Sequence, residues 1–268
     1  MVYLDYKDCI RLLQLSDTHL NAPENGHLLG MKTLDSLRSV LDVVDLEHPV
    51  IDLVLVTGDL SQDGSVESYR HLRRELDRFE SPCYWLPGNH DNQTNMDLVA
   101  ADKQLRNRVI KTPHWQIILL DTQVEGQVYG ELAEAELWML QQQLQAEPDL
   151  HTLIAFHHHP IAMGSRWIDT IGIRNSEALL ALVNAYDNVR CLIWGHVHQA
   201  SDQLIDGVRY LSTPSTCVQF EPHSKDFSVD RRSPGYRWLE LYPDGRIETS
   251  VSRVDHIEFE VDYSVKGY

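Results

Sequence analysis

Five short polar clusters interrupt this chain, and each one follows a run of apolar residues directly or after one proline. They are Asp17-Thr18-His19, Gly58-Asp59, Gly88-Asn89-His90-Asp91, His157-His158-His159-Pro160 and Gly195-His196-Val197-His198. Strand ends of this kind constrain the fold, because the ligands of open α/β sheets collect outside the carboxyl ends of the strands. We therefore expect a sheet-based fold that gathers the five clusters at one edge.

The order of predicted elements indicates the fold class. Apolar runs predict strands at 11–16, 51–57, 82–86, 115–121, 152–156 and 189–194, and helical periodicity lies at 31–47, 64–79, 131–146 and 175–187. Later residues read as short strands at 203–205, 208–211, 217–220, 236–241 and 247–254. This order predicts an α/β (α+β) fold of two packed sheets with helices outside. We expect one domain over 1–254, and a tail at 255–268 that frays or packs loosely.

Composition narrows the possible partners. The net charge is −17 and we find no run of lysine and arginine, whereas nucleic-acid binding needs a basic face. A small anionic substrate is compatible with the negative net charge, because bound metal cations would make the local electrostatic potential positive. No apolar run approaches the length of a membrane span, and the charged N-terminus lacks a signal-peptide core, so we expect a cytoplasmic protein with no membrane partner. The four cysteines form no C-x-x-C pair and are expected to be reduced thiols.

The side chains in the clusters are metal ligands by type. Carboxylate, amide and imidazole groups without a thiolate suit manganese, iron, cobalt or zinc. Asp17 and His19 lie two residues apart, which in a strand would put both on one face, and the Gly195 cluster repeats this spacing. Asp59 can share its two oxygens between two cations. His157 is the expected ligand of its triplet because it comes first after the apolar run, with His158 as the alternative.

Each cluster taken alone has an ordinary explanation, such as a helix-capping aspartate, an Asx turn or a loop histidine with satisfied hydrogen bonds. Five of them in a row, each at or just after a strand end, are not independent accidents. The whole pattern favours a two-metal hydrolytic site, a kind of site mostly used to attack phosphorus. His90 follows Asn89 directly, so it points elsewhere and is free to act as a proton donor, with Asp91 as its orienting partner.

The motifs D-x-H, G-D, G-N-H-D, H-H-H-P and G-H-x-H, in this order, resemble those of the calcineurin-like metallophosphoesterases over roughly residues 10–254. The resemblance implies a four-layer α/β/β/α sandwich with two mixed β-sheets flanked by helices. It also implies two metal ions, most often iron or manganese, with zinc or cobalt as alternatives. The implied ligands are Asp17, His19 and His198 for the first metal, Asn89, His157 and His196 for the second, and Asp59 for both.

A finer resemblance rests on the histidine triplet, residues 165–169 and 173–175, and the run 213–220. These stretches are similar to those of bacterial class III 3′,5′-cyclic AMP phosphodiesterases. That similarity implies hydrolysis of 3′,5′-cyclic AMP to 5′-AMP by a hydroxide that bridges the two metals, with His90 near the scissile phosphate. A broader phosphodiesterase or phosphomonoesterase, for instance one acting on 2′,3′-cyclic nucleotides or glycerophosphodiesters, is the alternative. A non-catalytic scaffold is a further alternative, although such a protein should have lost ligands.

Substrate contacts follow from the same hypothesis. The expected substrate-binding residues are His19, Asp59, Asn89, His90, His198, Trp167 and Arg174. Residues 163–175 form the candidate substrate-side loop, in which Trp167 would stack on a base and Arg174 would meet a phosphate. The alternatives are that Trp167 is a packing residue and Arg174 a surface charge.

Overall fold

Two mixed β-sheets form the centre of the protein, whose structure, a computed structural model, describes residues 1–267. The five-stranded sheet has the order β16 (Ile247–Arg253), β15 (Gly235–Leu241), β2 (Ile10–Leu15), β5 (Leu53–Thr57) and β6 (Cys83–Leu86). The seven-stranded sheet has the order β1 (Val2–Tyr3), β7 (Val109–Lys111), β8 (Trp115–Leu119), β9 (His151–Ala155), β10 (Val189–Trp194), β12 (Val208–Ser212) and β11 (Ser201–Ile205). The strands that precede the five clusters, β2, β5 and β6 in one sheet and β9 and β10 in the other, are parallel neighbours.

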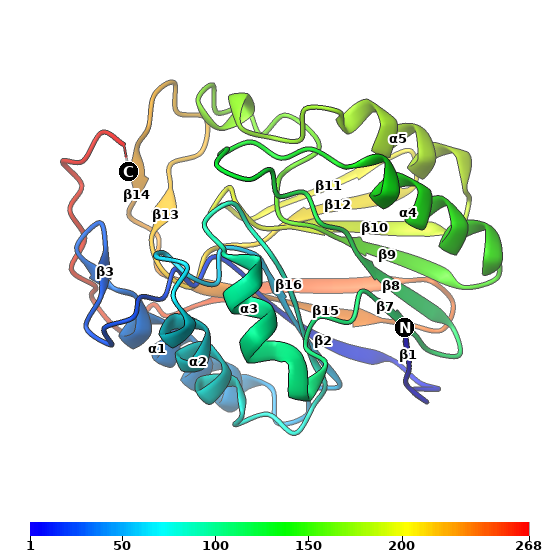
Figure 1. The fold of residues 1–268 in the computed structure, drawn as a ribbon, viewed down its shortest axis with the longest axis horizontal. Helices are drawn as coiled ribbons and strands as arrows, with labels where there is room; N and C mark the ends of the chain where they lie inside the picture. Colours follow the sequence, from blue (N-terminus) through cyan, green and yellow to red (C-terminus); the bar gives the residue numbers. More distant parts are fainter. Residues whose placement is uncertain (268) are drawn as a thin grey trace.

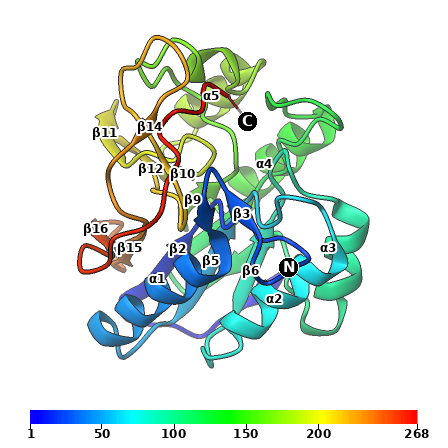
Figure 2. The same ribbon diagram turned by 90° about the vertical axis from the view of Figure 1, so that its left-hand side faces the viewer.

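Helices cover the outer face of each sheet (Figures 1 and 2). On the five-stranded sheet lie α1 (Thr33–Glu47), α2 (Val66–Leu76) and α3 (Gln93–Ala100), and on the seven-stranded sheet lie α4 (Glu134–Ala146) and α5 (Ser176–Ala185). The short elements are β3 (His27–Leu28), β4 (Met31–Lys32), β13 (Gln219–Phe220), β14 (Val229–Asp230) and the 3₁₀ turns η1 (Ala101–Lys103) and η2 (Ile168–Thr170). The expected four-layer α/β/β/α sandwich is confirmed.

Three apolar clusters account for the layers. In β5, Val54 and Val56 pack against the helices, whereas Leu53 and Leu55 pack against the other sheet. Because both faces of the strand are covered, its sequence is a continuous apolar run rather than an alternating one. The same division places Leu153 of β9 in the central layer and Ile154 in the layer under α4 and α5.

The structure differs from the sequence expectations mainly in its short elements. Helix α3 and strand β7 were not expected. The apolar positions of α3 are few, but Asn92 caps its N-terminus by accepting a hydrogen bond from the Asn95 N–H (3.0 Å). The tail is held more firmly than expected, since the Asp262 N–H donates to Leu29 O (2.7 Å) and Phe259 packs against two apolar clusters. Tyr268 lies outside the described residues.

Within residues 1–267, no helix combines the length and the apolar character that a membrane span requires. The cytoplasmic location and the single-domain boundary at residue 254 stay predictions. All four cysteines are free thiols, and Cys191 and Cys217 are buried.

Buried polar side chains tie the two sheets together. Arg237 of β15 is 3% exposed, and its guanidinium donates to Ser212 O of β12 (2.7 Å) and to Ser201 O of β11 (2.9 Å). Burial lowers the pKa of Arg237 to about 10, which leaves it charged at neutral pH. Gln14 of β2 similarly donates to Trp194 O of β10 (3.3 Å). These bonds fix the sheets relative to each other.

We expect Arg237→Leu to lower the free energy of unfolding by about 3 kcal/mol, because the substitution leaves buried carbonyl groups without donors. Urea unfolding of the purified protein measures this change. Arg70→Ala is the control, since Arg70 and its ion-pair partner Glu67 are 64% and 56% exposed and should contribute little. Equal stabilities for Arg237→Leu and the unsubstituted protein would contradict the role of Arg237.

Candidate metal centre

The ligand-type side chains lie just past the strands and not within them. Strand β2 ends at Leu15 and β10 ends at Trp194, so the expectation that extended strand geometry aligns the two spaced pairs is wrong. The backbone instead adopts left-handed conformations at all four positions of the two pairs, Asp17 (φ 55°), His19 (φ 44°), His196 (φ 65°) and His198 (φ 47°), and also at Asp59 (φ 50°). Aspartate and histidine are among the residues that tolerate this conformation best.

Two glycines allow the loops to approach one another. A Cβ atom at Gly88 would overlap the Asp59 carboxylate and would lie 2.7 Å from Nε2 of His157. Gly58 has φ of 92°, and a Cβ atom there would overlap the His157 ring. Both positions therefore require glycine for close packing, and Gly58 requires it for its backbone conformation as well.

The first group of side chains joins the loops after β2 and β10. The Nε2 atom of His198 lies 3.4 Å from Oδ1 of Asp17 and 3.2 Å from Nε2 of His19. Oδ2 of Asp59 lies 3.8 Å from Nε2 of His19. All four side chains are buried. These are the four side chains expected to bind the first metal.

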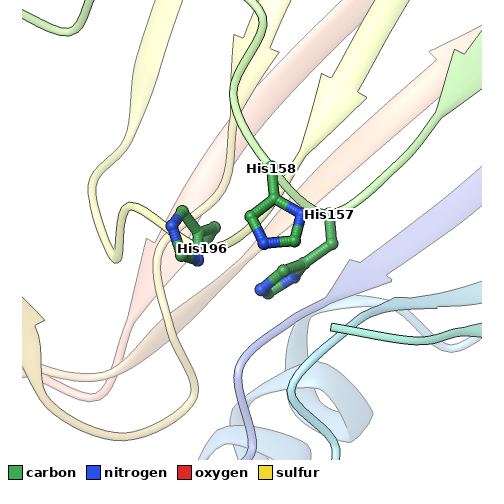
Figure 3. A group of neighbouring side chains, drawn as sticks. All are labelled: His157, His158 and His196. Carbon is green, nitrogen blue, oxygen red and sulfur yellow. The ribbon is translucent and has the colours of Figure 1, made fainter. Parts of the chain in front are cut away.

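The second group shares Asp59 with the first. Nε2 of His157 lies 3.2 Å from Oδ2 of Asp59 and 3.2 Å from Oδ1 of Asn89. The ring of His196 lies 5.0 Å from that of His157, and its buried Nε2 has no hydrogen-bond partner among residues 1–267. Figure 3 shows His157 and His158, from the loop after β9, beside His196 from the loop after β10. Of the two triplet alternatives, His157 is the one that reaches both Asp59 and Asn89, which favours it over His158.

Hydrogen bonds behind the rings orient the ligand atoms. The Nδ1–H groups of His157 and His198 donate to the carbonyl oxygens of Thr57 (2.9 Å) and Val218 (2.7 Å). Nδ1 of His19 is paired with Oε1 of Gln62 (2.7 Å). A carbonyl acceptor requires the proton on Nδ1, so Nε2 of each ring is directed at the site and is available to a cation. The side chains present therefore fit a pair of metal ions.

Electrostatics favours positive charge in this place. Burial alone would raise the pKa of Asp59, but His157 and His90 outweigh it and hold that pKa well below its usual range. Burial lowers the pKa of His19 to about 3, so this imidazole is neutral, as a metal ligand must be. At His157 burial lowers the pKa, but Asp59 and Asp17 outweigh it and raise the pKa to about 9. The two carboxylates thus favour positive charge beside Nε2 of His157.

The carboxylate of Asp91 connects two ligand loops. Its oxygens accept hydrogen bonds from the backbone N–H groups of Gly88 (2.8 Å), Leu60 (3.1 Å) and Ser61 (3.0 Å), and from the Tyr69 hydroxyl (3.0 Å). These bonds hold the loop that carries Asp59 against the loop that carries Asn89. The contacts support a structural role, and orientation of His90 by Asp91 stays a prediction.

His90 lies at the edge of the site. It is half-buried, its ring is 5.0 Å from the His19 ring, and its backbone N–H donates to Oδ1 of Asp59 (2.9 Å). Its side chain belongs with those of His19 and Asp59 to one group of potential ligand atoms, so proximity alone does not separate a ligand from a proton donor.

The two expected substrate-loop residues are engaged elsewhere in the protein. The Trp167 ring packs edge-on against Phe220 and Phe227, and its Nε1–H donates to the Ser224 hydroxyl (3.0 Å). Arg174 lies over the Tyr129 ring at 3.2 Å. These contacts favour the packing alternative for Trp167, and they place the exposed Arg174 on an aromatic side chain. Their substrate contacts stay predictions.

Sequence reasoning missed the groups behind the rings. Gln62 could have been found as a polar residue three positions after Asp59, but many loop glutamines look alike. Thr122 is paired with Nδ1 of His158 (2.8 Å), and no motif pointed to it. The carbonyl groups of Thr57 and Val218 carry no sequence signal, because every residue has one.

The chain is similar to known proteins along most of its length. The family model "Calcineurin-like phosphoesterase" matches residues 10–200. The 3′,5′-cyclic adenosine monophosphate phosphodiesterase CpdA of Pseudomonas aeruginosa is 46% identical over 259 residues, covering 97% of this chain and 95% of that protein. The protein of the same name from Vibrio vulnificus is 43% identical over 264 residues, covering 98% and 96%.

Solved structures share the fold at low sequence identity. A dimetal phosphatase from Danio rerio superposes with a TM-score of 0.66 at 16% identity, covering 93% of this chain and 100% of that one. The purple acid phosphatase PPD1 from yellow lupin gives a TM-score of 0.67 at 12% identity, covering 96% of this chain and 53% of that one. At such identities the likeness concerns the fold alone.

We expect Gly88→Ala to remove bound metal, because the added methyl group would displace the Asp59 carboxylate that faces both groups. Elemental analysis of the purified variant after dialysis against Mn²⁺ measures the loss. Gly126→Ala is the control for an added methyl group away from the site: its φ of 70° strains an alanine, but a Cβ atom there meets no atom of the described residues within 4 Å. Full metal content in Gly88→Ala would contradict the close approach of the two loops.

Proposed function

The chain belongs to the calcineurin-like phosphoesterase family, and on that premise we propose that it hydrolyses 3′,5′-cyclic AMP to 5′-AMP at a site for two metal ions. One observation carries the proposal. A single carboxylate oxygen, Oδ2 of Asp59, lies 3.2 Å from Nε2 of His157 and 3.8 Å from Nε2 of His19, so one residue faces both groups of ligands. A bridging carboxylate of this kind is what a two-metal site needs.

The two ions would be held by different loops. Asp17, His19 and His198 would hold the first, Asn89, His157 and His196 the second, and Asp59 both. When bound, the ions would activate a water molecule as the nucleophile and neutralise charge on the phosphoryl oxygens. Oxygen and imidazole ligands without a thiolate support iron or manganese, and they suit zinc or cobalt as well.

His90 would complete the reaction on the side of the leaving group. Water adds to phosphorus while the bond between phosphorus and the 3′ oxygen breaks, and that oxygen must gain a proton. His90 is half-buried at the edge of a site whose other imidazoles are buried, so it is well placed to meet the substrate and donate that proton. The hydrogen bond from its backbone N–H to Asp59 fixes its position relative to the metal ligands.

The choice of cyclic AMP rests on relatives. Proteins named as 3′,5′-cyclic AMP phosphodiesterases are 37–46% identical to this chain along almost its whole length. The same metal chemistry would serve 2′,3′-cyclic nucleotides or glycerophosphodiesters, so the substrate loops must decide. A non-catalytic scaffold is disfavoured because every expected ligand position is filled by a suitable residue.

Turnover by the Mn²⁺-loaded protein tests the proposal. We expect faster hydrolysis of 3′,5′-cyclic AMP than of 2′,3′-cyclic AMP or bis(p-nitrophenyl) phosphate, with 5′-AMP as the product identified by chromatography. Activity on bis(p-nitrophenyl) phosphate alone would support phosphodiester hydrolysis and reject 3′,5′-cyclic AMP as the substrate. No activity with two ions bound would reject both.

His90→Ala should keep both metals and lose turnover by about 10²–10⁴-fold, the usual contribution of a general acid. Metal content and kcat measured on the same sample separate the two roles. His27→Ala, at an exposed position in β3, is the control. Loss of metal from His90→Ala would instead make His90 a ligand.

A further inference from the structure

The proposed reaction gives no role to residues 213–220, although this run is one of the stretches that resemble cyclic AMP phosphodiesterases. Every residue in it is buried, including Thr213, Ser215, Thr216 and Gln219. Buried polar groups need hydrogen-bond partners. Among the described residues the hydroxyls of Thr213 and Thr216 have none, so the bonds of Ser215, Gln219 and the main chain indicate what this segment does.

One set of contacts holds the loop that carries Asp17. The Ser215 hydroxyl donates to Asp17 O (2.8 Å), the Thr216 N–H donates to Ser16 O (3.1 Å), and the Cys217 thiol lies 3.4 Å from Asp17 O. Asp17 has φ of 55°, a conformation that costs free energy and persists only where its surroundings enforce it. The contacts of this segment with the main-chain oxygens of Ser16 and Asp17 hold that conformation in place.

A second set of contacts fixes His198. Val218 O accepts the Nδ1–H of its ring (2.7 Å), and the Phe220 ring stacks on the imidazole with centroids 4.2 Å apart and planes 12° apart. The Phe220 N–H also donates to His198 O (3.3 Å). Rotation that turned Nε2 away from the site would break the carbonyl bond and push the imidazole into Phe220. Trp167 and Phe227 in turn pack against Phe220 at 5.1 and 5.4 Å.

The contacts are asymmetric between the two groups of ligands. They reach Asp17 and His198, both expected at the first metal. Among the hydrogen bonds that the described residues make, none joins the segment to Asn89, His157 or His196.

We propose that residues 213–220 are a clamp that orients Asp17 and His198 and thereby sets the affinity of the first metal site, with Ser215 and Phe220 as its positioning residues. This inference rests on the two-metal site of the proposed function and does not require that cyclic AMP be the substrate. Groups that orient metal ligands typically contribute 10–100-fold to metal affinity. The clamp should therefore change the affinity of one site and leave the other unchanged.

Metal binding by Phe220→Leu tests the clamp, because leucine keeps the apolar bulk and removes the flat ring. Calorimetric titration with Mn²⁺ and elemental analysis should show the first site weakened about 10–100-fold and the second unchanged. At a Mn²⁺ concentration that just saturates the unsubstituted protein, the variant should retain about one ion per chain. At higher Mn²⁺ concentrations the weakened first site should fill again, and the variant should then hold two ions per chain. Ser215→Ala should change metal binding in the same direction, and circular dichroism checks that each variant folds.

Three further variants make the result specific. His198→Ala and His157→Ala mark the binding curves expected when the first or the second site is lost. Val183→Ala is the matched control, since it removes buried apolar bulk from the same apolar cluster but lies in α5, outside the clamp. Two sites of undiminished affinity in Phe220→Leu and Ser215→Ala would overturn the clamp. Equal weakening of both sites, or equal loss in Val183→Ala, would overturn it too. An unsubstituted protein that binds two ions and leaves cyclic AMP intact would reject the proposed substrate only.

Discussion

The burial of two carboxylates among imidazoles is the constraint on which the rest of the structure depends. Asp17 and Asp59 are 0% and 1% exposed, and buried anions are tolerated only with compensating positive charge or donors. The five loops, their left-handed residues and the glycines at 58 and 88 serve to bring such compensation within reach. Two metal ions would satisfy both carboxylates and also Nε2 of His196, which has no partner in the part of the chain that the structure describes.

Much of the fold could be predicted from the sequence because apolar periodicity reports burial. Strand β5, covered on both faces, reads as an unbroken apolar run, and α4 begins and ends close to its expected limits. Helix α3 was not predicted because it buries only Met96, Val99 and Ala100, which are too few positions to show a helical apolar period. Strand β7 has three residues, which is too few to show a strand pattern in the sequence.

The candidate site was predicted better than the reason for its geometry. The residues expected as ligands do converge, but through left-handed turns beyond the strands, a backbone property that residue types suggest only weakly. Trp167 shows another limit. An aromatic residue in a loop near a site suggests stacking on a base, whereas here Phe220, Phe227 and Ser224 already engage the ring. Sequence position tells which loop a residue is in, and tertiary packing decides which way its side chain faces.

Each group of ligands draws side chains from both sheets. Asp17, His19 and Asp59 follow strands of the five-stranded sheet, whereas His157, His196 and His198 follow strands of the seven-stranded one. During synthesis the chain therefore cannot complete the second group before His196, or the first before His198, has left the ribosome. A truncated product that ends before β10 would lack His196 and His198, so it could complete neither group of ligands.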